Sequence, residues 1–169
     1  FDPADVFQAL AEEGISNLQG PPAMFTRLLH WLDEQGIDHP EAPALRYVYT
    51  GAAALDPALM QTVQARFGLP LHHGYGLSEY AGAVALVPRN SHRQDTSAGY
   101  AVEGAELRIV HPDTGEALPQ GERGEIWMRG VGRMPGYFRD PEATAQVIKP
   151  GGWYASGDDG NIKNGSERM

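Results

Sequence analysis

One short segment combines three side chains whose chemistry suits a nucleotide. Residues 73–79 read His-Gly-Tyr-Gly-Leu-Ser-Glu, so the ring of Tyr75, the hydroxyl of Ser78 and the carboxylate of Glu79 lie close together in the chain. An aromatic ring can stack on a base, a hydroxyl can meet a phosphate, and a carboxylate is a hard oxygen ligand for Mg²⁺. Taken alone, the segment is equally well explained as a structural Gly-Tyr-Gly turn.

Two further segments carry weaker signals of the same kind. Residues 49–55 read Tyr-Thr-Gly-Ala-Ala-Ala-Leu, and small residues at the end of a strand let a flat ligand approach the backbone, although close packing alone also explains them. Residues 152–158 read Gly-Trp-Tyr-Ala-Ser-Gly-Asp. The carboxylate of Asp158 can accept two hydrogen bonds from a ribose diol, whereas a lone Gly-Asp pair is more often a simple turn.

In this order the segments resemble the adenylate-forming, AMP-binding family of acyl-CoA and aryl-CoA ligases, luciferases and nonribosomal adenylation domains. Residues 74–79 resemble its Tyr-Gly-x-Thr-Glu signature and residues 156–158 its Thr-Gly-Asp. Between them, residues 121–126 resemble Gly-Glu-x-Gly-Glu-Ile, and residues 136–144 resemble Gly-Tyr-x-x-x-Pro-Glu-x-Thr. The resemblance extends from about residue 15 to about residue 160.

The resemblance implies a role for each matching residue. Tyr75 is expected to stack on adenine, Ser78 to meet the α-phosphate or acyl-adenylate, and Glu79 to bind Mg²⁺, with Ser78 and Glu79 as the catalytic candidates. Asp158 is expected to hold the ribose hydroxyls. The remaining nucleotide-binding candidates are small residues that act through their backbone, namely Gly51, Ala52, Ala53, Gly74 and Gly76.

The implied reaction is attack of a small carboxylic acid on the α-phosphate of ATP, which releases pyrophosphate, followed by displacement of AMP by the thiol of CoA. The implied ligands are therefore ATP or AMP, Mg²⁺ and CoA as co-substrate. The family's glycine-rich phosphate loop has no counterpart before residue 51, its C-terminal lid domain has none after Asp158, and Asp159 stands where an apolar residue is usual. We therefore expect the second half of a large N-terminal domain, the rest of the parent chain as partner, and no activity from this chain alone.

Two other interpretations remain open. Leu77 favours acyl or aryl ligases over amino-acid adenylation domains, where proline is usual at this position, but the distinction depends on one residue. A noncatalytic nucleotide-binding or interaction module could also keep the fold. His72 and His73 do not indicate a shared metal ion, because adjacent strand residues point to opposite faces.

Composition excludes several classes of protein. The 169 residues contain 22 acidic and 13 basic side chains, for a net charge of −9, with no basic stripe of the kind that nucleic-acid binding needs. The absence of cysteine excludes disulfides, thiolate zinc sites and cysteine nucleophiles. The longest apolar run, Ala83 to Val87, is too short to span a membrane. We expect a cytoplasmic ligase, with fatty acid metabolism as its setting.

The elements that must position these residues alternate between helix and strand. Asp-Pro pairs predict helix starts at Asp2, Asp56 and Asp140. A further helix follows residues 21–22 and has an apolar face at i, i+3, i+4 and i+7, and strands are expected at residues 15–18, 45–50 and 69–73. This rhythm predicts an α/β fold over residues 1–97, with a mostly parallel sheet flanked by helices. The apolar face comprises Phe25, Leu28, Leu29 and Leu32.

The pattern changes after about residue 97. Residues 106–109 and 125–129 alternate polar and apolar side chains, which is typical of half-buried antiparallel strands. A smaller β-rich, distorted barrel-like subdomain is therefore expected over residues 98–169. We further expect the strands that end near Gly51 and Gly74 to be neighbours, and Tyr75, Glu79 and Asp158 to converge on one cleft.

Overall fold

A computed structural model describes residues 1–89, 91 and 95–163. The chain forms two compact units: the first comprises Phe1–Tyr75 and Leu86–Gly99, and the second comprises Gly76–Ala85 and Tyr100–Met169. The fold is mixed α/β, with a mostly parallel sheet and helices followed by a curled antiparallel sheet, which confirms the predicted fold class. The predicted domain boundary near residue 97 stays a prediction.

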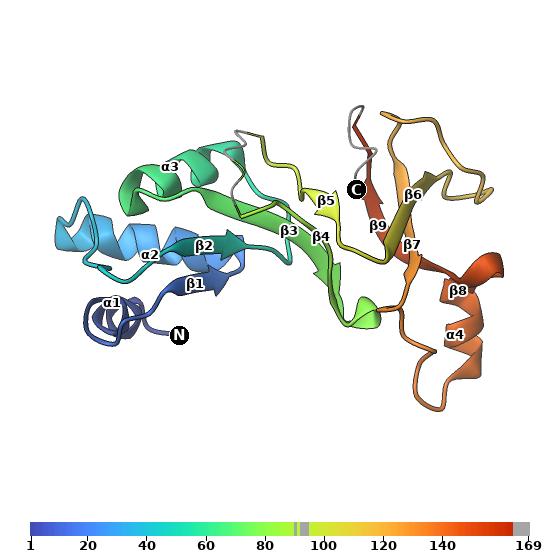
Figure 1. Cartoon of the computed structure of the whole chain (residues 1–169), viewed down its shortest axis with the longest axis horizontal. Helices are drawn as coiled ribbons and strands as arrows, with labels where there is room; N and C mark the ends of the chain where they lie inside the picture. The colour runs from blue at the N-terminus through green and yellow to red at the C-terminus, as the bar shows by residue number, and fades with distance from the viewer. Residues whose placement is uncertain (90, 92–94, 164–169) are drawn as a thin grey trace. The chain divides into compact units, whose positions relative to one another are not determined.

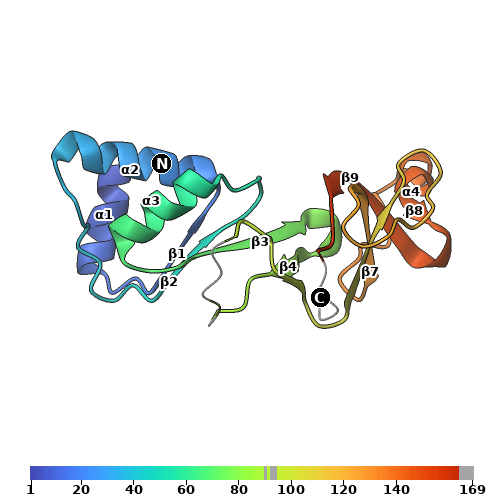
Figure 2. The same ribbon diagram turned by 90° about the horizontal axis from the view of Figure 1, so that it is seen from above.

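The first unit is built from helices that alternate with parallel strands. Strand β2 pairs in parallel with β1 on one side and with β3 on the other. Figure 2 shows the helices on one face of these strands. The elements are α1 (Pro3–Glu12), β1 (Asn17–Gly20), α2 (Pro22–Gln35), β2 (Tyr47–Thr50), α3 (Pro57–Phe67) and β3 (Leu71–Leu77).

The hydrophobic core of this unit lies between the helices and the sheet. The predicted apolar face of α2 is confirmed, since Phe25, Leu28 and Leu32 are completely buried and Leu29 is nearly so. From β2, Val48 is also fully buried in this core. Burial of one such side chain contributes about 1.5–3 kcal/mol to folding, so this face of α2 holds the helix against the sheet.

Each predicted Asp-Pro helix start is confirmed as an N-cap. A carboxylate oxygen of Asp2 accepts from the backbone N–H of Ala4 at 2.9 Å. Asp56 accepts from two backbone N–H groups at the start of α3, at 2.9 and 3.0 Å, and Asp140 accepts from one at the start of α4 (Pro141–Val147), at 2.9 Å. Proline follows each cap, where its missing N–H leaves no intrahelical bond unmade.

The second unit contains an antiparallel sheet with strand order β6-β7-β9-β8. The alternating segments at residues 106–109 and 125–129 lie in β6 and β7, which confirms their prediction as antiparallel strands. Figure 1 shows α4 beside β8. The remaining elements are the 3₁₀ turn η1 (Ser78–Tyr80), β4 (Gly82–Leu86), β5 (Tyr100–Ala101), β6 (Ala105–Val110), β7 (Gly124–Gly130), α4 (Pro141–Val147), β8 (Ile148–Lys149), the 3₁₀ turn η2 (Pro150–Gly152) and β9 (Trp153–Gly160).

Strand β3 is longer than the sequence predicts. The pattern predicts a strand that ends at His73, but β3 continues to Leu77, so Gly74-Tyr75-Gly76 lies within a strand and not in a loop beyond its end. The two glycines serve close packing: a Cβ at Gly74 would overlap the hydroxyl of Tyr49, and one at Gly76 would overlap the carbonyl of Gly82. Glycine is thus required here by space, and not by a turn.

Candidate active site

In the first unit, the predicted small-residue segment lies directly beside the predicted tyrosine segment. Thr50 pairs with His73 in the parallel register of β2 and β3. A Cβ at Gly51 would lie 3.2 Å from the carbonyl oxygen of Gly74. The prediction that these two strand ends are neighbours is therefore confirmed, and the backbones of Gly51 and Gly74 are in close contact.

The backbone after β2 is held by His73. Its ring is buried, with Nε2 at 3.2 Å from the carbonyl oxygen of Ala53 and Nδ1 at 3.1 Å from that of Thr96. Ala52 and Ala53 are exposed, and Ala52 has a φ of 65°, a left-handed conformation that costs free energy for a residue with a side chain. The imidazole thus fixes a strained, solvent-facing loop at the position predicted to line the nucleotide.

The neighbouring histidine makes a different contact. The ring of His72 stacks on Tyr47, with 4.6 Å between ring centroids. The two histidines therefore contact different parts of the unit, as expected from their alternation along β3. Across residues 1–89, 91 and 95–163, no group of three or more His, Asp or Glu side chains is arranged to hold a metal ion. Tyr75 is half-buried and is the last residue of the segment Phe1–Tyr75 of the first unit.

In the second unit, Ser78 and Glu79 lie in the 3₁₀ turn η1, with Ser78 exposed and Glu79 half-buried. The hydroxyl of Tyr137 donates to Glu79 Oε1 at 3.3 Å. The backbone N–H of Met134 donates to the carbonyl oxygen of Glu79 at 2.7 Å. Both the side chain and the backbone of Glu79 are therefore held by the loop that follows β7.

This loop fits closely over η1. Tyr80 is buried, and its hydroxyl donates to the carbonyl oxygen of Arg129 at 3.1 Å. A Cβ at Gly132 would lie 2.7 Å from the ring of Tyr80. On its far side the loop is fixed by Thr144 of α4, whose Oγ1 accepts from the N–H of Tyr137 at 2.9 Å. The motif at residues 136–144 thus connects the start of α4 to Glu79.

The predicted ribose-binding carboxylate lies in an irregular stretch of β9, where the register with β7 shifts. Ser156 Oγ donates to the carbonyl oxygen of Ile126 at 2.6 Å and accepts from the N–H of Asp158 at 3.0 Å. The N–H of Gly157 donates to Glu125 at 2.9 Å, and Gly157 has a φ of 74°, which favours glycine. The serine hydroxyl therefore orders this irregular stretch of β9, and the side chain of Asp158 is exposed.

Two ion pairs flank this region. Arg123 Nε lies 2.6 Å from Asp159 Oδ2, so the acidic residue at position 159 forms an exposed ion pair. Arg129 forms a two-pronged pair with Glu106, at 2.9 and 2.7 Å. The hydrogen bond from Arg129 holds the pKa of Glu106 below its ordinary value, and the bond from Glu106 raises the pKa of Arg129.

The predicted residues thus fall into two sets. Gly51, Ala52, Ala53, Gly74 and Tyr75 belong to the first unit, and Gly76, Ser78, Glu79 and Asp158 belong to the second. The convergence of Tyr75, Glu79 and Asp158 on one cleft stays a prediction. The sequence pattern assigns no role to His73 or Tyr137. Tyr137 lies inside the motif at residues 136–144, but the sequence gives no sign of its contact with Glu79.

Residues 1–138 match the family model described as AMP-binding enzyme. The chain belongs to this family. Among curated members, 4-coumarate–CoA ligase 2 of Nicotiana tabacum is 38% identical over 136 residues, which cover 78% of this chain and 25% of that protein. The 4-coumarate–CoA ligase 5 of Oryza sativa subsp. japonica is 32% identical over 173 residues, covering 99% of this chain and 31% of that protein.

Solved structures of similar proteins have the same fold. ATP-bound MatB from Rhodopseudomonas palustris superposes with a TM-score of 0.87 at 28% identity, over 98% of this chain and 32% of that one. The amide bond synthetase McbA from Marinactinospora thermotolerans superposes with a TM-score of 0.83 at 32% identity, over 98% of this chain and 34% of that one. The chain therefore spans a quarter to a third of the length of these relatives. In the described part of the chain, every helix is too short or too polar to cross a bilayer.

Proposed function

We propose that this chain is part of an ATP-dependent carboxylate–CoA ligase that forms an acyl-adenylate and then an acyl-CoA thioester. The observation that carries the proposal is the AMP-binding family match over residues 1–138, with 4-coumarate–CoA ligases among the similar proteins. The same proposal includes a small carboxylic acid, ATP and CoA as ligands, the rest of a longer chain as partner, a cytoplasmic location and a setting in fatty acid metabolism.

In this proposal the first unit recognises the base. The ring of Tyr75 stacks on adenine, and the backbones of Gly51, Ala52 and Ala53 line the same region. Stacking needs a flat, uncrowded approach to the ring, and the half-buried Tyr75 lies on the face of β3 opposite to that of Gly74 and Gly76. His73 contributes by holding the carbonyl of Ala53 in place.

The second unit would hold the ribose and the phosphates. The exposed carboxylate of Asp158 can accept two hydrogen bonds from a ribose diol, and Ser78 offers a hydroxyl to the α-phosphate. Glu79 is the oxygen ligand available to Mg²⁺, whose positive charge would offset the charge of the reacting phosphoryl group. Mg²⁺ is commonly held by one or two carboxylates plus substrate phosphates, so a single half-exposed glutamate fits that ion.

The chain alone is proposed to be inactive. Adenylation brings two anions together, so cations must surround the triphosphate. Of the 13 basic side chains of this chain only two are lysines, Lys149 and Lys163, neither of them in a family motif, and the net charge of −9 repels ATP at long range. Loss of several charge-stabilising groups, each contributing about 3–4 kcal/mol to the transition state, would bring turnover below detection.

A second candidate differs only in the group that displaces AMP. McbA, which is described as an amide bond synthetase, is as similar in fold as the ligases are, so an amine could replace the thiol of CoA. The family match is also compatible with an amino-acid adenylation fragment and with a noncatalytic nucleotide-binding or interaction module. Glu79 and Asp158 keep the same roles in every catalytic version of the proposal.

A chimera tests the proposal. Residues 1–160 would replace the matching segment of MatB, and ATP–pyrophosphate exchange would be followed with a panel of carboxylic acids. We expect acid-dependent exchange that falls at least about 100-fold in Glu79→Ala and Asp158→Ala chimeras. Product analysis with CoA or an amine then separates thioester from amide formation. A folded chimera that binds AMP without exchange would support a noncatalytic nucleotide-binding module, and one that also fails to bind AMP would support an interaction module.

A further inference from the structure

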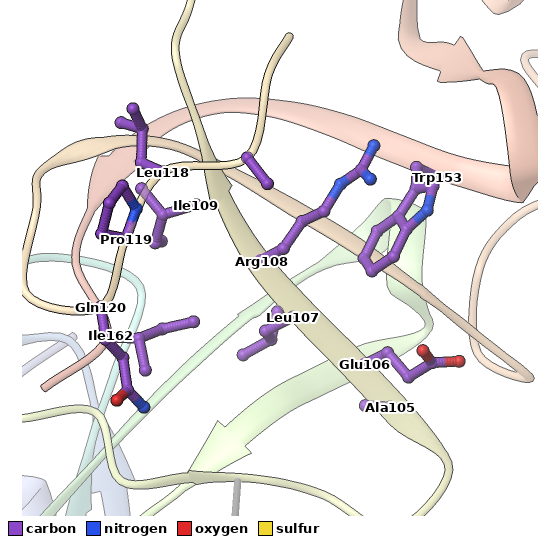
Figure 3. Close-up of a pocket in the computed structure, with 11 residues that line it drawn as sticks. Ala105, Glu106, Leu107, Arg108, Ile109, Leu118, Pro119, Gln120, Trp153 and Ile162 are labelled. Carbon is purple, nitrogen blue, oxygen red and sulfur yellow. The ribbon is translucent and has the colours of Figure 1, made fainter. Parts of the chain in front are cut away.

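A cavity of about 400 Å³ lies along β6 in the second unit. Figure 3 shows apolar side chains at one end, among them Leu118, Pro119 and Ile162, and the guanidinium of Arg108 beside the indole of Trp153 at the other. The lining of the cavity contains none of the residues proposed to bind nucleotide. Its chemistry therefore calls for a separate explanation.

The guanidinium of Arg108 lies close to two indole rings. Its Cζ lies 4.7 Å from the ring centroid of Trp127 and 4.1 Å from that of Trp153. Nε is buried and has no hydrogen-bond acceptor among the described residues. A guanidinium stays protonated at neutral pH and carries its N–H donors around its edge. Since the guanidinium lies close to both indole rings, its N–H edge is where a further partner can bind.

The acidic side chains of the same strands are already engaged. Glu106 is paired through both oxygens with Arg129, and the oxygens of Glu125 accept from Trp127 and Gly157. Burial, and secondly the positive charge of Arg129, lower the pKa of Arg108. Both causes disfavour the charged form of the guanidinium, and a partly buried cation that is not paired with an anion is costly.

We propose that this cavity binds a small organic carboxylate, with its carboxylate at the edge of the Arg108 guanidinium and its apolar body against Leu107, Leu118 and Ile162. A carboxylate matches the planar donor edge of a guanidinium. The apolar walls favour an organic acid over inorganic phosphate, which has no apolar part to bury. This proposal goes beyond the proposed function, because it involves neither ATP nor any residue assigned to the nucleotide.

The test titrates the chain with benzoate and hexanoate at constant ionic strength. Two-dimensional NMR of the indole N–H signals of Trp127 and Trp153 reports on the rings that flank Arg108. We expect saturable shifts with a Kd of about 1 mM, the affinity of a small fragment. Benzamide, which keeps the ring and loses the charge, should bind at least about 10-fold more weakly. Inorganic phosphate distinguishes recognition of an organic acid from attraction of any anion.

Variants locate the site. Arg108→Gln should weaken benzoate binding at least about 10-fold, whereas Arg123→Gln, which removes the same charge from an ion pair on the same unit, should leave it unchanged. Ala105→Phe fills the cavity with Arg108 intact and should also abolish benzoate binding. This variant therefore tests the location of the site even if Arg108→Gln misfolds. The proposal is overturned by absence of a saturable shift, by equal binding to Arg108→Gln, or by phosphate binding as tightly as benzoate.

Discussion

The hydroxyl of Tyr137 donates a hydrogen bond to the carboxylate of Glu79, with 3.3 Å between Oη and Oε1, although 58 positions separate the two residues in the chain. Further hydrogen bonds support this contact. The loop that carries Tyr137 also donates from Met134 to the backbone of Glu79, and it is fixed to α4 through Thr144. The glutamate proposed to bind Mg²⁺ is thus oriented by a motif that comes much later in the sequence.

Tyr137→Phe tests this orientation. Removing one partly exposed hydrogen bond to a carboxylate should weaken the proposed metal interaction by about 0.5–1.5 kcal/mol, or roughly 2- to 10-fold. The measurement is the Mg²⁺ concentration that half-saturates pyrophosphate exchange in the MatB chimera. Phe138→Leu, at an exposed site in the same loop, is the matched control and should change nothing. Equal effects of the two variants would contradict the assigned role.

His73→Ala should loosen the loop after β2. The carbonyls of Ala53 and Thr96 would both lose the imidazole, at a cost of about 1–3 kcal/mol in the free energy of unfolding. Urea denaturation measures the loss, and amide hydrogen exchange should quicken at Ala54 and Leu55. His30→Ala, at an exposed helix position, is the control. If exchange at Ala54 stays as slow as in the parent, His73 does not hold the loop.

Gly130→Ala should lower the free energy of unfolding much more than Gly121→Ala. Both glycines have positive φ, 141° and 91° respectively, but a Cβ at Gly130 would overlap the carbonyl of Gly104 and the hydroxyl of Tyr80, whereas one at Gly121 meets open space. We expect losses of about 2–4 kcal/mol for Gly130 and about 1 kcal/mol for Gly121 in thermal or urea unfolding. Similar losses would mean that backbone strain, and not crowding, decides both.

Asp56→Ala should destabilise the first unit by about 1 kcal/mol, because two backbone N–H groups of α3 lose their acceptor. Urea denaturation measures the change. Asp56→Asn keeps an acceptor oxygen at the cap and should lose much less. A loss for asparagine as large as that for alanine would point to the charge of Asp56, and not to its hydrogen bonds.

The Glu106–Arg129 pair predicts a pH dependence of stability. Because the hydrogen bond from Arg129 lowers the pKa of Glu106 from 4.5, the stabilisation is present above pH 4.5 and is lost as the pH falls through the lower folded-state value. The difference in melting temperature between the parent and Glu106→Gln should therefore shrink as the pH is lowered from 6 towards about 3. Glu116→Gln, in an exposed turn, is the control. A difference that grows on acidification would contradict this.

Local chemistry explains what could be predicted from the sequence. The Asp-Pro caps and the apolar face of α2 depend on residues a few positions apart, so the pattern alone identifies them. The extension of β3 through Gly74 and Gly76 could not be predicted, because it depends on Tyr49 and Gly82 lying against those glycines. The contacts of Glu79 and His73 likewise join segments brought together only by tertiary structure.

The division of the chain into two units has a consequence for the order in which it folds during synthesis. The segment Leu86–Gly99 belongs to the first unit, although Gly76–Ala85 of the second unit precedes it. The ring of His73 contacts the carbonyl oxygen of Thr96 at 3.1 Å, and the N–H of Val87 donates to the carbonyl oxygen of His73 at 3.0 Å. The first unit therefore completes its contacts only after residue 99 has left the ribosome. By then Gly76–Ala85 has already emerged, but the residues of the second unit that it contacts are still to be synthesised.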